Sequence, residues 1–280
     1  MRYGEVAQGS RFCRENIAGR GAASHGRLVS GELAVRGKRI LVLLTFNEVE
    51  ALPKIFDRLP LSAADEVLAV DGGSTDGTLE FLQAKGVRVL KQPRRGRGVA
   101  FRVALEATDA DVICYYSPDG NEDPDDIPKI FEKIEKDGCD LLVASRMMEG
   151  AYNEEDIHWW RPRKWVNQLF TLAANLLWNR GPYVEDTING FRAVRAESLR
   201  RCACDADGFP IEYQMSIRMM KLGFVIGEMP THEYPRLGGQ STAESWPTGV
   251  VFVKTLLREV SLGRRVNAGG AEKVELPSHG

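Results

Sequence analysis

The chain has 280 residues, of which 43% are hydrophobic and 27% are charged, and its 37 basic and 39 acidic side chains give a net charge of −2. These values exclude a disordered chain, a collagen-like repeat and a coiled-coil rod, and the near-neutral charge argues against a nucleic-acid partner. The five cysteines include no CxxC pair, which favours free thiols in the reducing cytoplasm over a disulfide framework.

The N-terminal residues 1–38 are expected to form a flexible basic arm. Residues 1–39 carry eight Lys or Arg against three Glu, with many glycines and without the apolar segment of a secretory signal. An organelle transit segment is the alternative interpretation. No apolar run approaches the roughly 20 residues that span a bilayer, so we predict no transmembrane helix.

Short apolar strands and helices alternate from residue 39 onward. Apolar runs predict strands at 40–44, 67–70, 87–90, 112–116 and 141–144. The helical spacing of apolar residues predicts helices at 51–59, 78–85, 99–107 and 127–136. This alternation is typical of a doubly wound, mostly parallel α/β sheet.

The alternation ends near residue 150. Helices are predicted at 163–180, 211–222 and 250–260, and strands near 187–194 and at 224–228. We therefore expect the basic arm (1–38), one α/β domain with a C-terminal helical elaboration (39–245), and a C-terminal amphipathic helix and tail (246–280).

Polar side chains follow the predicted strands, and the ligands of doubly wound sheets bind beyond the carboxyl ends of the strands. These side chains are Thr45, Asn47, Glu48, Asp71, Ser74, Asp76, the arginines of 94–98, Ser117, Asp119, Asn121, Ser145 and Arg146. Acidic, basic and amide groups together suit an anionic ligand that is held partly through a metal.

The most specific motif is Asp-Gly-Gly-Ser-Thr-Asp-Gly-Thr at 71–78. Its glycines let the backbone approach a ligand, Asp71 is placed to bond a ribose or a base, and Asp76 is placed to cap the next helix. Combined with Thr-Phe-Asn-Glu at 45–48, this motif resembles the family-2 glycosyltransferases of the GT-A fold. The likeness covers residues 39–241, and it implies a GT-A fold, a GDP- or UDP-linked sugar donor and inversion at the anomeric carbon.

The resemblance also implies a divalent cation, magnesium or manganese, on the two donor phosphates. The family carries Asp-x-Asp after its fourth strand, where this chain has Ser-Pro-Asp-Gly-Asn-Glu-Asp at 117–123. A serine replaces the first Asp of the motif, and Asp119 matches the second. Asp119 and Asn121 are therefore the expected metal ligands, whereas Glu122 and Asp123 are expected to cap the following helix.

The resemblance implies that the donor nucleotide is held by residues after the first four strands. They are Thr45, Asn47, Glu48, Asp71, Ser74, Arg97, Pro118 and Asp119. Arg97 stands in the place of a lysine in the family's Gly-Lys-Gly segment, and we expect it to contact phosphate. A solvated basic face is the alternative for this arginine-rich loop, and its Gly-x-Gly is a weak dinucleotide-binding signal.

Three later segments resemble the part of the family that performs transfer. Ser-Arg at 145–146 and Glu-Asp-Thr-Ile-Asn-Gly-Phe-Arg at 185–192 imply Asp186 as catalytic base or acceptor contact, with Glu185 as its alternate. Pro-Arg-Leu-Gly-Gly-Gln-Ser at 235–241 is similar to the polyprenyl-phosphate branch, which includes dolichol-phosphate mannose synthases and bacterial polyprenyl-phosphate glycosyltransferases. The resemblance implies that the cations of the transfer site are Arg146, Arg163 and Arg236.

A polyprenyl phosphate acceptor agrees with this chemistry. A phosphate monoester has a second pKa near about 6, so it is largely dianionic at neutral pH and needs little help from a general base. The segment 158–165 holds three of the five tryptophans beside three basic residues, which indicates peripheral contact with the inner face of the membrane. A core helix is the alternative interpretation of this tryptophan-rich region.

The amphipathic stripe at 253–260 fits contact with lipid, with a second subunit or with the sheet, so a homo-oligomer stays open. Two other functions also stay open. A glycosyltransferase that uses a soluble polysaccharide or small-molecule acceptor would share the donor motifs. Ser117 in place of the first Asp motivates a non-catalytic, nucleotide-binding relative.

Overall fold

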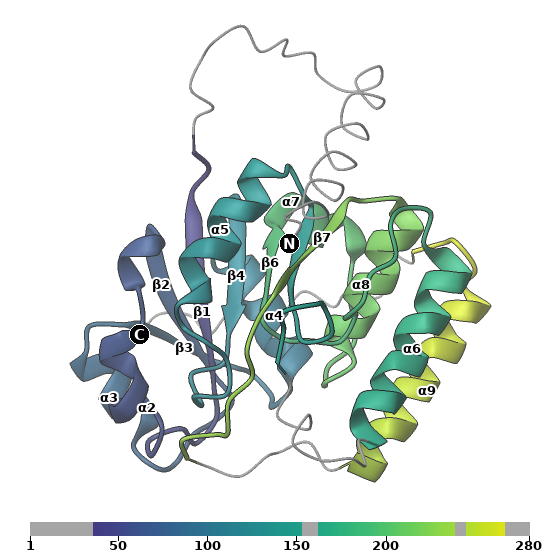
Figure 1. The fold of residues 1–280 in the computed structure, drawn as a ribbon. Helices are drawn as coiled ribbons and strands as arrows, with labels where there is room; N and C mark the ends of the chain where they lie inside the picture. The colour runs from purple at the N-terminus through teal and green to yellow at the C-terminus, as the bar shows by residue number, and fades with distance from the viewer. Residues whose placement is uncertain (1–35, 153–161, 239–244, 267–280) are drawn as a thin grey trace, which may run out of the picture.

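The structure of the chain is a computed structural model that describes residues 36–152, 162–238 and 245–266. It contains a seven-stranded sheet with helices on both faces (Figure 1). The strands are β1 (Arg39–Thr45), β2 (Glu66–Asp71), β3 (Arg88–Lys91), β4 (Val112–Tyr116), β5 (Leu141–Ser145), β6 (Arg192–Arg195) and β7 (Ile226–Pro230). Their order in the sheet is β3-β2-β1-β4-β6-β5-β7.

The helices connect the strands and extend the domain at its C-terminal end. They are α2 (Leu52–Ile55), α3 (Thr78–Ala84), α4 (Arg97–Glu106), α5 (Asp126–Lys136), α6 (Pro162–Trp178), α7 (Ala196–Cys202), α8 (Ile211–Leu222) and α9 (Ser245–Ser261), with 3-10 turns at Phe56–Arg58 and Leu61–Ala63. Among the described residues, no helix has the length and apolar character needed to cross a bilayer.

Strand pairing is parallel except around β6. β1 pairs in parallel with β2 and β4, β2 pairs with β3, and β5 pairs with β7, whereas β6 is antiparallel to both of its neighbours. The prediction of a mostly parallel, doubly wound sheet is therefore confirmed. Because β1, β2 and β4 point the same way, the loops that follow them meet at one edge of the sheet.

The predicted and observed elements differ by more than two residues, or in existence, at four places, and other bounds shift by one or two residues. The helix expected at 51–59 ends at Ile55 and continues as a 3-10 turn, because Pro60 prevents a longer helix. The strand expected at 187–194 begins only at Arg192, and the last helix begins at Ser245 and not at residue 250. Helix α7 was not predicted, because it is short and follows β6 without an intervening loop.

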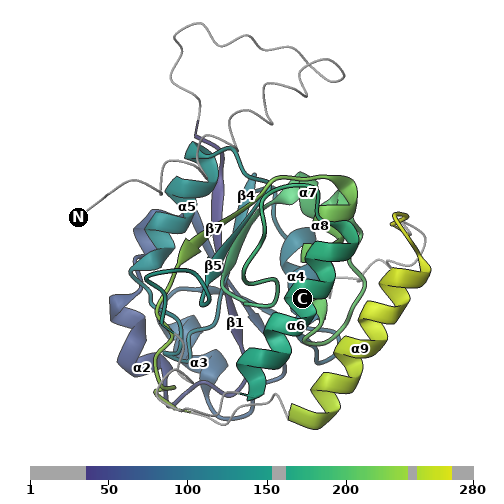
Figure 2. The same ribbon diagram turned by 45° about the vertical axis from the view of Figure 1, so that its right-hand side comes forward.

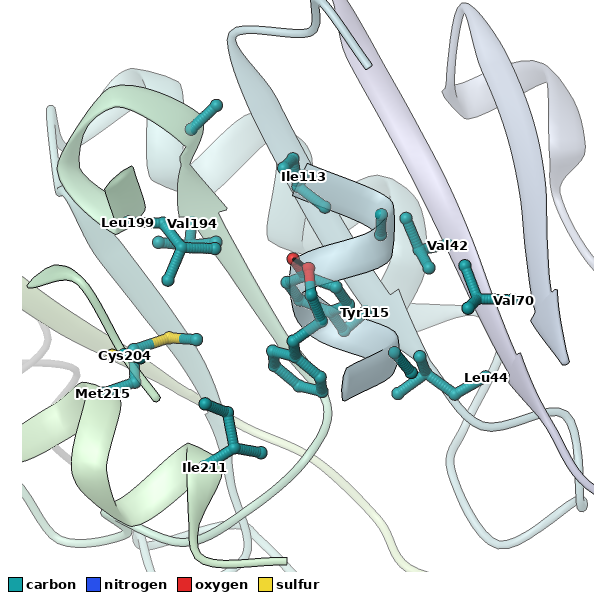
Figure 3. Packing of buried hydrophobic residues seen from close by; sticks show 14 of the residues in the cluster. Val42, Leu44, Val70, Ile113, Tyr115, Val194, Leu199, Cys204, Ile211 and Met215 are labelled. Carbon is teal, nitrogen blue, oxygen red and sulfur yellow. Dashed lines mark hydrogen bonds between the residues drawn. The ribbon is translucent and has the colours of Figure 1, made fainter. Parts of the chain in front are cut away.

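Two apolar clusters cover the two faces of the sheet, and β1 contributes to both. All seven residues of β1 are buried. Leu41 and Leu43 pack with α2 and α5 on one face, and Val42 packs with α4 and α8 on the other. Figure 3 shows the second cluster, with Tyr115 of β4 at its centre. Burial on both faces explains the continuous apolar run of β1. The cysteines within the described ranges are free thiols, as expected, and all of them are buried.

Helices α6 and α9 lie side by side beyond α8, on the side away from the sheet (Figures 1 and 2). Phe170 of α6, Tyr213 of α8 and Phe252 of α9 form one cluster of rings, with centroids 5.5 to 5.8 Å apart. Although the sequence suggested a separate C-terminal segment, α9 therefore packs on the same body as α6 and α8.

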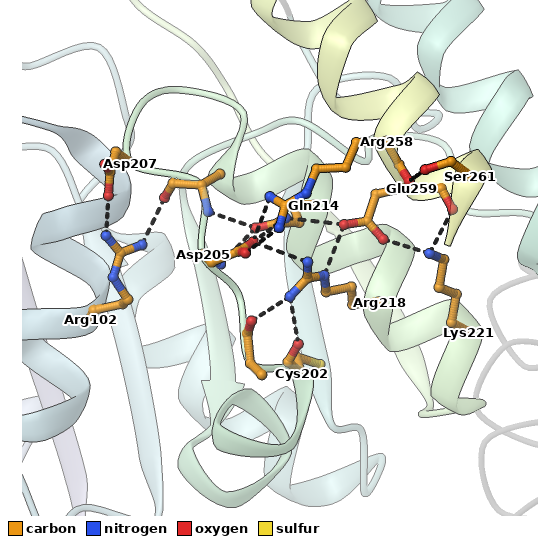
Figure 4. A network of polar contacts seen from close by, with 12 residues as sticks. Arg102, Cys202, Asp205, Asp207, Gln214, Arg218, Lys221, Arg258, Glu259 and Ser261 are labelled. Atoms are coloured by element: carbon orange, nitrogen blue, oxygen red, sulfur yellow. Dashed lines mark hydrogen bonds and ion pairs between the residues drawn. The ribbon is translucent and has the colours of Figure 1, made fainter. Parts of the chain in front are cut away.

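Buried ion pairs attach α9 to α8 (Figure 4). Glu259 of α9 is fully buried and accepts hydrogen bonds from Nε of Arg218 at 2.9 Å and from Nζ of Lys221 at 2.5 Å. The side-chain amide of Gln214 donates a third bond at 3.1 Å. Because removing charges from water is costly, the two cations depend on the carboxylate of α9.

Glu259→Ala is expected to lower the free energy of unfolding by about 3–5 kcal/mol. It would leave Lys221 buried without a carboxylate and Arg218 with one carboxylate, that of Asp205 at 3.0 Å, besides two backbone carbonyls. Arg258→Ala is the control, because Arg258 pairs with Asp205 near the surface, where such pairs contribute less than about 1 kcal/mol. Urea unfolding measures both variants, and equal losses would contradict the role assigned to Glu259.

Candidate functional site

The loops after β1 and β2 interlock at the carboxyl edge of the sheet. The backbone N–H of Asn47 donates to Oγ of Ser74 at 2.8 Å, and Oδ1 of Asn47 accepts the N–H of Thr75 at 3.0 Å. The N–H of Glu48 donates to Oγ1 of Thr78 at 2.8 Å. Asn47 has a φ of 55°, a left-handed conformation that asparagine adopts more readily than most residues. The two loops therefore form one unit.

Asp71 holds this unit from inside. Its side chain is buried, and its carboxylate accepts the N–H groups of Gly73 and Ser74 at 2.8 Å each, Oγ of Ser74 at 2.5 Å and Oγ1 of Thr45 at 3.2 Å. These four bonds use the acceptor positions of the carboxylate, so a nucleoside would have to replace one of them. The donor contacts of Thr45, Asp71 and Ser74 stay predictions, and in the structure all three residues hold the loops.

Asp76 links both loops to α3. Its Oδ1 accepts the N–H of Thr78, the first residue of α3, at 3.0 Å, and its Oδ2 accepts the N–H of Val49 at 3.1 Å. The prediction that Asp76 caps α3 is wrong, because the N-cap position is Gly77 and Asp76 precedes it, bonding only the first residue of the helix. One carboxylate thus satisfies backbone donors from two neighbouring loops.

Asp119 and Arg236 form an ion pair after β4. Nη1 of Arg236 lies 3.1 Å from Oδ2 of Asp119, and the N–H of Leu237 donates to the carbonyl of Asp119 at 2.9 Å. The side-chain amide of Asn121 donates to the carbonyl of Tyr234 at 2.5 Å. The segment after β7 is therefore fixed against the loop after β4. This contact between the two segments brings together Asp119, Asn121 and Arg236, which the sequence had assigned to metal and phosphate binding.

Two further carboxyl groups, those of Glu48 and Glu122, lie close enough to Asp119 to be affected by its charge. Burial, followed by the negative charge of Asp119, raises the pKa of each to about 8. Oε2 of Glu48 is buried and has no hydrogen-bond partner within the described part of the chain. Among the described residues, it is the one buried side-chain nitrogen or oxygen atom without a hydrogen-bond partner. It is therefore a candidate contact for a ligand.

The prediction that Glu122 caps α5 is wrong. Its carboxylate accepts the backbone N–H of Ser117 at 2.8 Å, and its backbone forms an isolated antiparallel bridge with Glu233. This bridge keeps Glu122 beside β4 and away from the first turn of α5. Asp123 does not cap α5 either, because it accepts the N–H of Asp125 at 3.0 Å in the preceding turn, and the N-cap position is Asp125.

Arg97, in the first turn of α4, reaches to the end of β4. Its Nη1 donates to Oγ of Ser117 at 3.2 Å, and its Nε pairs with the buried carboxylate of Glu212. A Cβ at Gly190 would overlap the guanidinium, so this glycine leaves the space that Arg97 occupies. Glu212 compensates the charge of Arg97, whose contact with a donor phosphate stays a prediction.

A second buried ion pair joins β5 to the loop before β6. Nε of Arg146 lies 2.9 Å from Oδ2 of Asp186, and Nη1 lies 3.4 Å from Oε1 of Glu233. Oδ1 of Asp186 also accepts the N–H groups of Ile188 and Asn189 at 3.1 and 3.0 Å. Burial acts to raise the pKa of Asp186, but the charge of Arg146 and these bonds outweigh it and lower the pKa. Asp186 is therefore a weak base that holds Arg146.

Glu228 of β7 fixes the backbone of this loop. Its two oxygens accept the N–H groups of Glu185 at 2.7 Å and of Asp186 at 2.9 Å. Burial raises the pKa of Glu228 to about 8. Glu228, Glu212 and Glu233 were not among the site residues predicted from the sequence. The signal available for Glu228 was a single acidic residue inside an otherwise apolar strand. Helix α8 mixes apolar, polar and charged residues, so Glu212 gave no such signal.

An apolar hollow of about 480 Å³ opens beside the Arg146–Asp186 pair. Its walls are Met147, Trp165, Gln168, Leu169, Leu172, Tyr183 and Glu185. The lining includes Met147 and Glu185, which are the chain neighbours of Arg146 and Asp186, whereas the side chains of the ion pair lie behind them. An apolar hollow next to a buried cation fits a ligand with an anionic head and a hydrocarbon chain.

The described residues include no group of three or more His, Cys, Asp or Glu side chains arranged to hold a metal ion. Asp119 and Asn121 lie in one loop, next to the buried Pro118. A cation at this place would complete its ligands with phosphate and water oxygens. Residues 1–35 of the basic arm, residues 158–161 and 239–241, and the side chain of Arg163 lie outside the described part of the structure.

Glu228→Gln is expected to weaken the dependence of stability on pH. The pKa of this carboxyl group is about 8 in the folded chain and about 4.3 in the unfolded chain. The group therefore stabilises the folded chain fully below about pH 4.3, and this contribution is lost as the pH rises through about 8. The free energy of unfolding should therefore fall between about pH 5 and about pH 8, and by less in Glu228→Gln than in the wild type.

Urea unfolding across this pH range measures the difference. Glu80→Gln, at an exposed position of α3, is the control and should keep the wild-type slope. If the free energy of unfolding falls equally with pH in Glu228→Gln and in the wild type, Glu228 does not contribute to the pH dependence of stability as expected.

A family profile described as "Glycosyl transferase family 2" matches residues 40–202, which is more than half of the chain. The chain is 29% identical over 230 residues to an undecaprenyl-phosphate mannosyltransferase of Micrococcus luteus, covering 77% of this chain and 91% of that protein. It is 29% identical over 221 residues to a dolichyl-phosphate hexose transferase of Haloferax volcanii, covering 78% and 92%. It is 30% identical over 202 residues to glycosyltransferase AglJ of Haloferax volcanii, covering 71% of this chain but only 63% of AglJ.

A similar fold occurs in glucosyl-3-phosphoglycerate synthase of Mycobacterium tuberculosis, solved in complex with Mn²⁺, UDP and glucosyl-3-phosphoglycerate. The TM-score is 0.63 at 20% sequence identity, and the match covers 80% of both chains. At this identity the likeness concerns the fold alone. The matched profile runs from β1 to α7 and includes the interlocked loops and the loop after β4. The chain therefore belongs to the family-2 glycosyltransferases and has the GT-A fold.

Proposed function

We propose that this glycosyltransferase moves a sugar from a GDP- or UDP-linked donor to a polyprenyl or dolichyl phosphate at the inner, cytoplasmic face of a membrane. The observation that carries this proposal is the apolar hollow beside the buried Arg146–Asp186 pair. The hollow suits the hydrocarbon chain of the acceptor, and Arg146 suits its phosphate. Relatives named as undecaprenyl-phosphate and dolichyl-phosphate transferases support the same class of acceptor.

The transfer would be a single displacement with inversion. An oxygen of the acceptor phosphate attacks the anomeric carbon, the bond from that carbon to the donor diphosphate breaks, and its electron pair leaves with the nucleoside diphosphate. The phosphate is already largely dianionic at neutral pH, so the ionised Asp186 is not needed as a base and serves to orient Arg146. Arg146, Arg163 and Arg236 would screen the two anionic groups from each other.

A divalent cation, magnesium or manganese, fits the residues around Asp119. Asp119 and Asn121 would hold it, and the buried Oε2 of Glu48, which lacks a hydrogen-bond partner in the described ranges, supports a cation nearby. Mg²⁺ commonly takes one or two carboxylates and completes its ligands with substrate phosphates. The cation, when bound, neutralises the charge that develops on the departing diphosphate.

The nucleoside would lie on the interlocked loops after β1 and β2. We assign donor binding to Thr45, Asn47, Glu48, Asp71, Ser74, Arg97, Pro118 and Asp119. The hydrogen bonds among these loops support the assignment, because they present the loops as a preformed surface.

Arg236→Ala is expected to tighten the binding of Mn²⁺ about fivefold in the absence of nucleotide. Arg236 pairs with Oδ2 of Asp119 and would compete there with the metal. Asp119→Ala should abolish both this binding and metal-dependent turnover. Electron paramagnetic resonance of free Mn²⁺ measures the affinity without any substrate.

Asp125→Ala is the control for these variants, because it removes an exposed carboxylate from the same loop region. It should bind Mn²⁺ as the wild type does. Weaker binding by Arg236→Ala would contradict the competition, and normal turnover by Asp119→Ala would remove Asp119 from the metal site.

A transfer assay tests the proposed function as a whole. Purified full-length protein is mixed with Mg²⁺ or Mn²⁺, labelled UDP- and GDP-sugars and a short-chain polyprenyl phosphate. Label that moves to the organic phase with one donor is the expected result. Release of nucleotide without labelled lipid would contradict the acceptor and indicate a soluble one. Nucleotide binding without any transfer would identify a non-catalytic relative.

A further inference from the structure

We infer that the outward sides of α6 and α9 form a docking surface for an anionic lipid bilayer. This α6–α9 face carries two apolar stripes, made of Leu169, Leu172 and Leu176 on α6 and of Val253, Leu257 and Val260 on α9. Leu169, Leu176 and Leu257 are exposed by 66%, 77% and 62%. Large apolar side chains that gather in this way mark an interaction surface.

Both stripes point away from the protein. Phe170 and Ala174 of α6 and Phe252 of α9 are buried in the cluster that packs on α8. The stripes follow helical spacing on the opposite sides of the two helices. Figures 1 and 2 show α6 and α9 next to each other at the outer edge of the molecule, with no other described element beyond them.

The charges of this face complement an anionic bilayer. Among the described side chains of α6 and α9, the single acidic residue is Glu259, which is buried in ion pairs with α8. Lys164 and Lys254 lie on the two helices, and exposed arginines follow their C-terminal ends. Cations beside exposed apolar side chains favour anionic lipid. A second copy of the chain would bring the same cations face to face, which is repulsive.

The face is continuous with the hollow beside Arg146. Leu169 and Leu172 belong to both, so a hydrocarbon chain could pass from the bilayer into the hollow without crossing water. Neither helix of the face can cross a bilayer by itself, so the helices would lie on its surface. This continuity rests on the proposed function, whereas the apolar stripes and the charges do not.

Flotation of the full-length chain with vesicles tests the surface. The vesicles contain phosphatidylcholine, with or without phosphatidylglycerol. Leu176→Glu/Leu257→Glu changes two positions outside the hollow and should lower the partition constant at least about tenfold. Leu176→Gln/Leu257→Gln should also bind more weakly, because it removes the apolar area without adding charge. Gln83→Glu/Ala84→Glu is the matched control, because it adds two charges at exposed positions of α3 and should bind as the wild type does.

Wild-type binding should increase with phosphatidylglycerol and decrease with salt. Unchanged vesicle binding by Leu176→Glu/Leu257→Glu would overturn the inference. A wild-type dimer that this variant converts to monomer, with unchanged vesicle binding, would also overturn it and assign the face to a second subunit.

Transfer to a short-chain polyprenyl phosphate without vesicles separates this inference from the proposed function. Leu176→Glu/Leu257→Glu should retain that transfer, which also shows that the variant is folded. Vesicle binding by a wild type that transfers no sugar to the lipid would overturn the proposed function and leave the docking surface standing. Transfer by a wild type that binds no vesicle would overturn the docking surface alone.

Discussion

Charge compensation in a dry interior governs how this site is built. At the surface, the exposed Arg236 pairs with Asp119. Two largely buried arginines at the strand ends are matched by carboxylates from distant parts of the chain, Arg97 by Glu212 and Arg146 by Asp186. An uncompensated buried charge costs several kcal/mol, so these pairs are the condition for bringing the arginines to the edge of the sheet. The carboxylates therefore determine where the cations stand before any anionic ligand arrives.

The interior also holds carboxyl groups that no arginine matches fully. Burial raises the pKa values of Glu48, Glu122 and Glu228 to about 8, so each is largely protonated at neutral pH. In the proposed function, such protonation would limit the negative charge of the donor site and help an anionic diphosphate to approach. In the proposed function, a cation beside Asp119 would lower the pKa values of Glu48 and Glu122, so that binding of the metal would release protons.

Local signals in the sequence are enough to predict the frame of the fold but not the pairing of charges. The apolar run at 40–44 indicates a strand buried on both faces, and the glycine-rich segment 71–78 indicates a loop at a strand end, whatever their partners are. Glu228 and Glu212 could not be found in this way, because 42 and 115 residues separate them from Asp186 and Arg97. The prediction that Glu122 caps α5 failed for a related reason. A carboxylate that caps a helix and one that turns back to the preceding strand have the same local sequence.

Helix α8 connects the two ends of the proposed reaction. Its first turn carries Glu212, which compensates Arg97 at the edge of the sheet, and its second half carries Arg218 and Lys221, which hold α9 through Glu259. Helix α9 of the α6–α9 face and the sheet edge that carries Arg97 are thus both attached to α8 by buried ion pairs. Breaking such a pair costs several kcal/mol. If a bilayer covers that face, its distance from Arg146 is set by packing and not by a hinge. The adjustable part of the complex is then the acceptor, whose flexible hydrocarbon chain must bring the phosphate from the bilayer to a site that does not move toward it.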